Sequence, residues 1–299
     1  MDGIVYANGT WGPARDARVS VFDHGLLYGD GIFEGIRAYN GRVFKLERHI
    51  DRLFESAAAI RLAIGMTPHR VAGLVLETCR QNAIVDGYIR LLVTRGAGDL
   101  GIDPRSCPRA ELFVIARPVG TLYRRAPDKG ISLATSPFRR IATDALSPEI
   151  KSLNYLNNVL AKMDATDRGA DEALFLGRDG LVAEATADNV FVVTPGGIAT
   201  PPTTQTLKGI TRETVIEIAA SEGFRVDERP LSLVDVWTAR EVFLCGTMAE
   251  IVPVGSVDGR PIGSGAPGEI TTRIMAAYAS LVRATGTPIP SAALEAEAV

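Results

Sequence analysis

The stretch "SPEIKSLNYLNNVLAK", residues 147–162, decides how the rest of this chain is interpreted. It places Lys151 behind a proline and directly before a predicted helix over about residues 152–168. A lysine at a helix start is usually a charge exposed to water. The alternative is a lysine whose amine does chemistry, and that interpretation needs partner residues elsewhere in the chain.

The composition is that of an ordinary globular protein. The chain has 299 residues, 46% hydrophobic and 22% charged, with a formal net charge of −3. This length allows two domains with a sizeable core. The weakly acidic balance gives no reason to expect nucleic acid as a partner. Neither a signal peptide nor an apolar run long enough to span a membrane occurs, so we expect a soluble cytoplasmic protein.

The cysteines point to a reducing compartment. Cys79, Cys107 and Cys245 are odd in number, widely separated, and without C-x-x-C spacing. This spacing argues against a zinc site or a disulfide framework, and no metal site is expected. The reducing cytosol fits best.

Changes in periodicity divide the chain into two expected domains. Residues 120–129 lose all periodicity and are interpreted as a linker. They separate an N-terminal domain, residues 1–119, from a C-terminal domain, residues 130–284. The last residues, 285–299, carry Pro, Ala and Glu without an apolar face and are expected to form a loosely held tail.

Both domains combine strands with amphipathic helices. Asn8-Gly9 and Asn40-Gly41 suit type I′ hairpin turns. Apolar residues recur at helical spacing from Leu46 to Ile60. The pattern predicts further helices at 67–82, about 211–222 and about 267–283, and strands or hairpins at 88–96, 111–119, 131–136, 172–185, 189–194, 241–246 and 250–263.

Two other segments could supply partners for Lys151. In "TLKGITRETV", Gly209 and Ile210 precede Thr211 at a predicted helix start, where unpaired amides and the helix dipole can hold a phosphate. The alternative is that Thr211 caps its own helix. In "LVAEATADNVFVV", Glu184 ends an apolar strand, where a carboxylate is costly to desolvate without a cationic or protonated partner. The alternative is an exposed glutamate at a sheet edge.

Together the three segments meet the needs of pyridoxal phosphate. This cofactor requires a lysine amine for covalent attachment, a cradle for its phosphate, and an acidic group that keeps the pyridine nitrogen protonated. Lys151, Thr211 and Glu184 match those needs in turn.

Six motifs in chain order resemble the signatures of the class IV (fold type IV) pyridoxal-phosphate aminotransferases, and most of all the branched-chain amino acid aminotransferases. The motifs are "YGDGIFEGIRAY", "YIRLLVTRGAGDLG", "KSLNYLNNVLAK", "EATADNVF", "LKGITRETV" and "CGTMAEIVPV". The resemblance runs from about Tyr6 to Val282. It implies an α+β or α/β fold like that of D-amino acid aminotransferase, with a small two-layer N-terminal domain and a larger pseudo-barrel C-terminal domain. It also implies a homodimer, or a higher homo-oligomer, in which N-terminal loops help to close the neighbouring subunit's site.

The resemblance assigns cofactor roles residue by residue. Lys151 corresponds to the lysine that links to the cofactor and then moves a proton, for which its amine must be neutral. Glu184 corresponds to the partner of the ring nitrogen, and Tyr155 to the partner of the ring hydroxyl, although some relatives place this tyrosine one residue later. Arg52 corresponds to a phosphate ligand; the alternative is a surface helix arginine. The remaining cofactor contacts fall on Leu207, Gly209, Ile210, Thr211 and Thr247.

Substrate recognition is assigned mainly to the N-terminal domain. Phe33 is expected to line an apolar pocket in which Gly35 leaves room, although the two could instead be a core residue and a strand glycine. An arginine at the pocket edge could engage the acidic side chain of glutamate. The loop 94–101 is expected to close over the neighbouring subunit's site. The complete substrate set is Tyr28, Phe33, Gly35, Arg37, Tyr88, Arg90, Met248 and Ala249.

The implied reaction converts leucine, isoleucine or valine and 2-oxoglutarate into the branched 2-oxo acid and glutamate. Two departures from the family pattern, Met248 in place of a small residue and Ala185 in place of glycine, leave substrate breadth open. D-amino acid aminotransferase, (R)-amine transaminase and aminodeoxychorismate lyase are alternatives on the same fold. A binding or scaffold protein that retains the fold is a non-enzymatic alternative.

Overall fold

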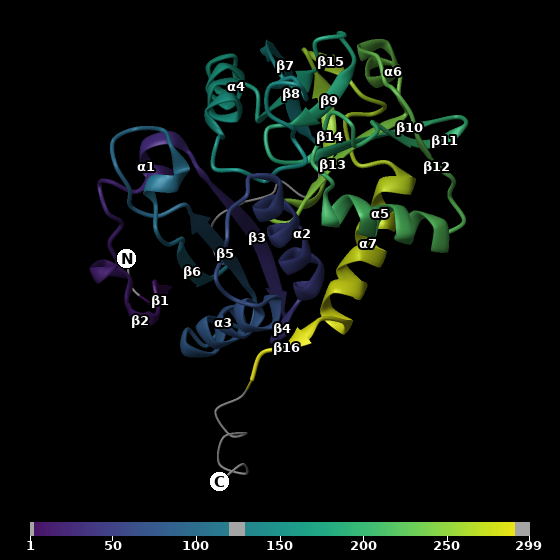
Figure 1. Ribbon diagram of the computed structural model, residues 1–299. Helices are drawn as coiled ribbons and strands as arrows, with labels where there is room; N and C mark the ends of the chain where they lie inside the picture. Colours follow the sequence, from purple (N-terminus) through teal and green to yellow (C-terminus); the bar gives the residue numbers. More distant parts are fainter. Residues whose placement is uncertain (1–2, 120–128, 291–299) are drawn as a thin grey trace. The chain divides into compact units, whose positions relative to one another are not determined.

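The computed structural model describes residues 3–119 and 129–290, which form two compact units (Figure 1). Unit 1 comprises Met1–Leu122, Ile150–Asn154 and Val282–Val299, and unit 2 comprises Tyr123–Glu149 and Tyr155–Leu281. The expected linker, 120–129, lies outside the described residues apart from Lys129. Segment 150–154, which carries Lys151, belongs to unit 1, whereas the sequence pattern assigned it to the C-terminal domain.

Unit 1 is an antiparallel sheet with helices packed on it. Its strand order is β16-β4-β3-β5-β6-β1-β2. Helices α2 (Leu46–Ala59) and α3 (Pro68–Gln81) bury their apolar faces against the sheet, as Figure 1 shows. The other elements are β1 (Ile4–Ala7), β2 (Thr10–Pro13), η1 (Ala14–Asp16), α1 (His24–Tyr28), β3 (Gly31–Tyr39), β4 (Arg42–Val43), β5 (Gly87–Thr94), η2 (Pro104–Ser106), β6 (Glu111–Pro118) and β16 (Thr287–Pro288).

Most elements predicted for unit 1 are confirmed. Asn8 and Gly9 join β1 to β2 with φ of 49° and 106°, so both have the positive φ of the expected turn. The same holds for the pair Asn40-Gly41, which joins β3 to β4. The prediction of a loose tail is wrong for Thr287–Pro288, because these residues pair with β4 and Ile289 packs against the core.

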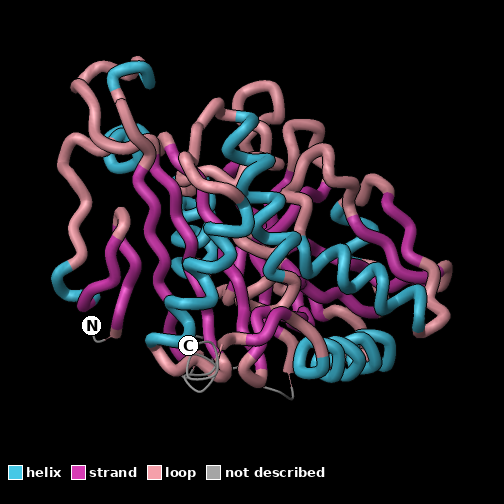
Figure 2. Tube along the Cα trace, turned by 60° about the horizontal axis from the view of Figure 1, so that its bottom comes forward, coloured by secondary structure: helices cyan, strands magenta, loops and turns pink. Residues whose placement is uncertain are grey.

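Unit 2 contains a mixed sheet and the helices α4 to α6, with most of α7. Figure 2 shows the strands of both units in magenta and the helices in cyan. Its strand order is β12-β11-β10-β13-β14-β7-β8-β9, with β15 paired to β14. The elements are β7 (Ile131–Arg139), α4 (Leu156–Asp167), β8 (Glu172–Leu176), β9 (Val182–Ala185), β10 (Asn189–Thr194), β11 (Gly197–Thr200), α5 (Ile210–Ser221), β12 (Val226–Glu228), α6 (Leu233–Trp237), β13 (Glu241–Gly246), β14 (Glu250–Val257), β15 (Arg260–Pro261) and α7 (Glu269–Ala284). No helix in the described part of the chain is both long and apolar enough to cross a membrane.

The helix expected over 152–168 starts later than predicted, at Leu156. The segment before it is not helical because its peptide groups pair with the first residues of β3, where Ser152 forms a bridge with Ile32. Phe33 N donates to Lys151 O at 2.9 Å, and Leu153 N donates to Gly31 O at the same distance. Lys151 therefore lies on a segment paired with β3, not at a helix start.

Three charged or titratable side chains are buried together in unit 1. Glu34, on β3, is fully buried, and Arg52 on α2 is only 6% exposed. The Glu34 carboxylate accepts from Arg52 Nε at 2.7 Å and Nη2 at 2.8 Å, and from His49 Nδ1 at 2.8 Å. Burial alone would raise the pKa of Glu34, but the charge and hydrogen bonds of Arg52, together with His49, hold that pKa at about 2. Burial lowers the pKa of His49 below its usual 6.5, against the raising effect of Glu34, and the charges of Arg52 and Lys151 add to the lowering.

These pKa directions predict that the protein loses stability in acid. Below pH 6.5 the unfolded chain protonates His49, and below 4.5 it protonates Glu34, while the folded state resists both. The free energy of unfolding should fall as pH falls, with Glu34 accounting for on the order of 3 kcal/mol between its two pKa values. Urea unfolding of wild type and Glu34→Gln at pH 7, 5 and 3 measures this. An equal loss in both proteins would contradict the assignment to Glu34.

Candidate active site

The main chain of unit 1 fixes Lys151 next to an aromatic ring. Besides its pairing with β3, Lys151 donates its backbone N–H to Ser56 Oγ on α2 at 3.2 Å. Its Nζ lies 4.4 Å from the centroid of the Phe33 ring. The amine therefore stands over the end of β3, on a backbone held from two sides. It is half-buried, so the sequence-based alternative of a freely solvated charge is wrong.

One face of β3 and β5 gathers the predicted substrate residues. The register pairs Gly35 with Arg90 and Arg37 with Tyr88, and side chains at directly paired positions share a face. Arg90 Nη2 donates to Tyr88 Oη at 3.1 Å, and its guanidinium carbon lies 4.6 Å from the Phe33 ring centroid. A methyl group on Gly35 would lie 2.1 Å from Tyr88 Oη, so the tyrosine fills the space that glycine leaves.

The two other predicted substrate residues of this unit have different surroundings. Arg37 is buried, and its guanidinium carbon lies 4.8 Å from the Tyr39 ring centroid. Tyr28 is exposed at the end of α1 and donates its hydroxyl to the Leu100 carbonyl. The loop 94–101 is tied to the segment around α1, since Gly98 N donates to Phe22 O at 3.1 Å.

Sequence reasoning missed the support of Arg52. The alternative of a surface helix arginine is wrong, because the guanidinium is buried against Glu34. Glu34 lies inside the quoted motif "GIFEGIRAY", yet only its partners explain a buried charge there. The one available signal is the spacing of His49, Arg52 and Ser56 at i, i+3 and i+7, which places them on one face of a helix.

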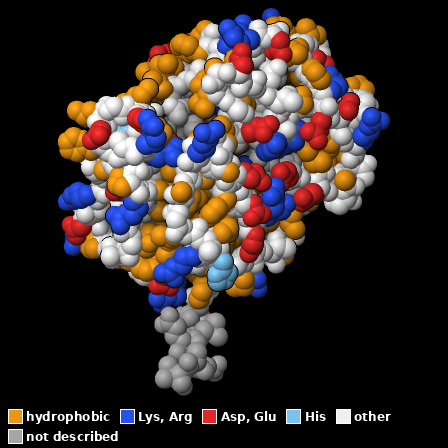
Figure 3. Space-filling view, in the orientation of Figure 1, with side chains coloured by type: hydrophobic (Ala, Val, Ile, Leu, Met, Phe, Trp, Pro, Cys, Tyr) orange, Lys and Arg blue, Asp and Glu red, His pale blue; other side chains and the backbone are white. Residues whose placement is uncertain are grey.

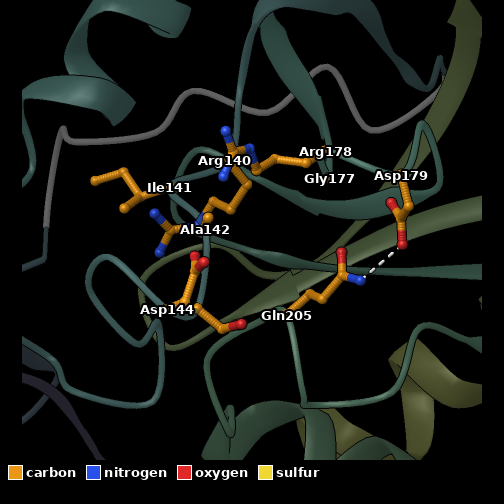
Figure 4. Close-up of a pocket in the computed structure, with 9 residues that line it drawn as sticks. Arg140, Ile141, Ala142, Asp144, Gly177, Arg178, Asp179 and Gln205 are labelled. Carbon is orange, nitrogen blue, oxygen red and sulfur yellow. Dashed lines mark hydrogen bonds between the residues drawn. The ribbon is translucent and has the colours of Figure 1, made fainter.

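Unit 2 holds Glu184 as an ion pair at the end of β9. The side chain is only 6% exposed, so the alternative of an exposed edge glutamate is wrong. Its Oε1 accepts from Arg140 Nε at 2.7 Å, and its Oε2 accepts from the Leu207 amide at 3.1 Å. Sequence reasoning missed Arg140, which directly follows β7. Arg140 lines a pocket of about 350 Å³. Figure 4 shows this pocket, in which Gln205 donates a hydrogen bond to Asp179; the two atoms are 2.8 Å apart.

The start of α5 is built from Gly209, Ile210 and Thr211. Gly209 is the N-cap, and no side chain caps the first amides, unlike in α3 and α6. The alternative that Thr211 caps its own helix is therefore wrong, since Thr211 is the second helical residue. Asn189 Nδ2 donates to Leu207 O at 3.2 Å, and a methyl group on Gly209 would lie 2.1 Å from Asn189 Oδ1. The glycine thus permits the close approach that fixes this turn.

The remaining predicted residues lie at the ends of unit 2 elements. Thr247, Met248 and Ala249 form the turn between β13 and β14, and Ala249 is buried. Tyr155 is the N-cap of α4 and is half-buried. The register of β13 and β14, which pairs Gly246 with Glu250, leaves the three turn residues to connect the two strands.

Each unit carries groups that fit part of pyridoxal phosphate. In unit 2, the uncapped amides of α5 suit a phosphate. Glu184, fixed as an acceptor by two donors, suits a protonated ring nitrogen. In unit 1, Lys151 offers an amine and Arg52 a guanidinium held in one plane by two hydrogen bonds.

Comparison with known proteins agrees with these features. Residues 31–257 match the family model described as amino-transferase class IV. A Methanocaldococcus jannaschii protein, which carries the provisional name of branched-chain-amino-acid aminotransferase, is 52% identical over 90% of this chain and 93% of its own. The branched-chain amino acid aminotransferase of Thermobaculum terrenum, solved in its PLP form, has a TM-score of 0.86 at 34% identity, covering 95% of this chain and 94% of its own.

The likeness extends to a second solved enzyme. The Escherichia coli branched-chain amino acid aminotransferase has a TM-score of 0.92 at 33% identity and covers 96% of both chains. Agreement over nearly the whole of both units confirms the expected fold type. The family model alone spans most of the chain. This protein belongs to the class IV aminotransferases.

Proposed function

We propose that this class IV aminotransferase transfers the amino group of L-leucine, L-isoleucine or L-valine to 2-oxoglutarate. The products are the branched 2-oxo acid and L-glutamate. The observation that carries the proposal is the face of β3 and β5, where Phe33 and Arg90 lie together and Lys151 stands over the same ring. An aromatic ring suits a branched apolar side chain, and an arginine suits the second carboxylate of glutamate. One pocket can then accept both substrates in turn.

Pyridoxal phosphate, when bound, supplies the aldehyde that takes up the amino group and a ring that withdraws electrons from the substrate's Cα. Lys151 Nζ would hold the cofactor and, once released from it, would move the proton, because the amine can accept a proton and the ammonium so formed can return it. Glu184, held in place by Arg140, would pair with the ring nitrogen and favour its protonated form. Tyr155 is proposed to bind the ring hydroxyl, and Leu207 to pack on the ring face. The proposed phosphate ligands are Arg52, Gly209, Ile210, Thr211 and Thr247.

The rest of the proposed substrate set orients the amino acid. Arg37, on the same strand as Phe33, and Tyr28, at the end of α1, are also assigned to substrate binding, and the main-chain amides of Met248 and Ala249 are assigned to the α-carboxylate. Met248 is larger than the small residue expected there, so its side chain sets an upper size for the substrate. Tyr88 holds Arg90 through its hydroxyl, which keeps the guanidinium at the pocket edge.

A half-reaction panel tests the proposed function. Enzyme saturated with pyridoxal phosphate is mixed separately with L-leucine, L-valine, L-glutamate, D-alanine and (R)-1-phenylethylamine while the cofactor's absorption is followed. We expect the three L-amino acids to remove the absorption band and the other two amines to react at least about 100-fold more slowly, a difference of about 3 kcal/mol in transition-state binding. Faster reaction with D-alanine, or pyruvate release from aminodeoxychorismate, would contradict the proposal.

Gly35→Ala should weaken substrate binding without unfolding the protein. The added methyl would displace the Tyr88 hydroxyl and with it the hydrogen bond to Arg90. We expect KM for L-glutamate to rise about tenfold, equivalent to about 1.4 kcal/mol, with the melting temperature little changed. Gly73→Ala is the matched control, because nothing lies within 4 Å of its added methyl. Unchanged KM in Gly35→Ala would show that the β3–β5 face does not bind substrate.

A homodimer is proposed from exposed apolar side chains of unit 1. Monomeric proteins rarely leave large apolar side chains grouped on the surface. Hydrophobic side chains reach the surface at the left of Figure 3, where Figure 1 places α1. Leu100 and Ile102, beside this segment, are 70% and 80% exposed. We call the group the α1 patch: Val19, Val21, Phe22, Leu26, Leu27, Tyr28, Leu100 and Ile102.

Charges placed in the α1 patch should separate the subunits. The double variant Leu26→Asp with Ile102→Asp would force two carboxylates into an apolar interface, at a cost of several kcal/mol. We expect light scattering after size exclusion to give a dimer for wild type and a monomer for this variant. Val85→Asp, at another exposed apolar residue outside the patch, is the control and should remain dimeric. A double variant with the wild-type mass would exclude the α1 patch as the interface.

We also infer a cytoplasmic location. Cys79, Cys107 and Cys245 are all free thiols. Burial raises the pKa of Cys79 to about 12 and that of Cys245 well above its usual range, so both remain protonated. A reducing compartment keeps such thiols unpaired. Fractionation of the source cells, with the protein found outside the cytoplasmic fraction, would contradict this.

A further inference from the structure

We infer that Glu34 and His49 are positioning residues, which hold the Arg52 guanidinium in the single orientation that binds the cofactor's phosphate. The inference rests on the proposed use of pyridoxal phosphate. It assigns a role to two buried groups that take no part in the proposed proton transfer. Its evidence is the geometry of three side chains within unit 1.

The Glu34 carboxylate forms a bidentate pair with the Arg52 guanidinium. Oε1 accepts from Nε at 2.7 Å and Oε2 accepts from Nη2 at 2.8 Å. A single hydrogen bond would let the guanidinium rotate about it, whereas two parallel bonds fix both its plane and its direction. Lysine could not replace arginine here, since its ammonium is a point charge without a plane.

His49 provides a third hydrogen bond to the carboxylate. It precedes Arg52 by three residues on α2, so both side chains project from one helix face toward β3. Its Nδ1 donates to Glu34 Oε2 at 2.8 Å, the same oxygen that accepts from Arg52 Nη2. Burial, and after it the charge of Arg52, lowers the pKa of His49 and favours the neutral imidazole, whose Nδ1–H can still donate to the carboxylate. The three hydrogen bonds together fix the orientation of the carboxylate.

The residues that flank Glu34 on its side of β3 are apolar. Glu34 lies between Ile32 and Ile36 on the core-facing side of β3, and both isoleucines are fully buried. The helix contributes Leu46, Ile50 and Leu53 to the same core. Apolar residues of similar volume often stabilise a protein as well as a buried ion pair does, because desolvation offsets the attraction. A buried carboxylate among these residues therefore points to orientation of Arg52 as its use.

The experiment compares cofactor binding in Glu34→Gln and Glu77→Gln. The first variant replaces an acceptor oxygen with an amide donor, so the side chain can no longer accept from Arg52 and His49 together. The second removes the charge of a glutamate that pairs with Arg80 on the surface of α3. We expect the Kd for pyridoxal phosphate, titrated into the apo form, to rise at least about tenfold in Glu34→Gln and to stay unchanged in Glu77→Gln. The ³¹P resonance of the bound cofactor should shift only in Glu34→Gln.

Two further variants separate orientation from folding. Glu34→Asp keeps the charge but is too short to reach both Arg52 and His49, so its Kd for pyridoxal phosphate should also rise. This variant tests the inference if Glu34→Gln does not fold. His49→Ala should weaken binding, and His49→Gln should restore it, because the amide can donate to Glu34. If Glu34→Gln and Glu34→Asp both keep the wild-type Kd and ³¹P resonance, the inference is overturned, while the proposed function stands. Failure of the wild type to take up pyridoxal phosphate would overturn the proposed function as well.

Discussion

The hydrogen bonds between residues 151–153 and the first residues of β3 fix the position of Lys151. Phe33 and Leu153 are the donors, and the amide of Lys151 is held separately by Ser56 of α2. The neighbouring chain on both sides of segment 150–154 belongs to unit 2, yet the segment is part of unit 1. A few main-chain bonds thus bring the amine to the ring of Phe33. The lysine is placed by sheet pairing, which uses its backbone and does not depend on its side chain.

Side chains of β3 alternate between two faces of the sheet, and each face has a different proposed role. Phe33 and Gly35 face the proposed substrate pocket together with their partners on β5. Ile32 and Ile36 point to the core, and Glu34 shares their side. The strand can therefore shape the pocket on one face and orient Arg52 through the other. A one-residue slip in register would exchange the two sets and abolish both functions.

Local sequence signals were sufficient for most of the architecture. The Asn-Gly turns and the apolar spacing of α2 depend on neighbouring residues only, and both are confirmed. The start of α4 was predicted too early because "KSLN" has no local feature that excludes a helix. Only pairing with a strand more than 100 residues away in sequence keeps it from being helical. The short strand β16 was missed for the same reason, since it exists only through β4.

The candidate site shows a similar limit. Residue type and motif order identified Lys151, Glu184 and the start of α5. They could not identify Arg140 or Glu34, because the roles of these residues depend on ion-pair partners that lie elsewhere in the chain. A strand carboxylate or a lone arginine is compatible with many surroundings. The burial of both carboxylates, Glu34 and Glu184, separates these ion pairs from ordinary surface charges.

Borohydride reduction of the enzyme with pyridoxal phosphate, followed by peptide mapping, tests the position of Lys151 most directly. Reduction makes the link between cofactor and lysine permanent, so mass spectrometry can locate it. If Lys151 carries the cofactor, the pyridoxyl group will lie on the peptide containing "SPEIKSLNY", and Lys151→Ala will carry none. A label on Lys162 or Lys208, or no label on any peptide, would contradict the role of Lys151.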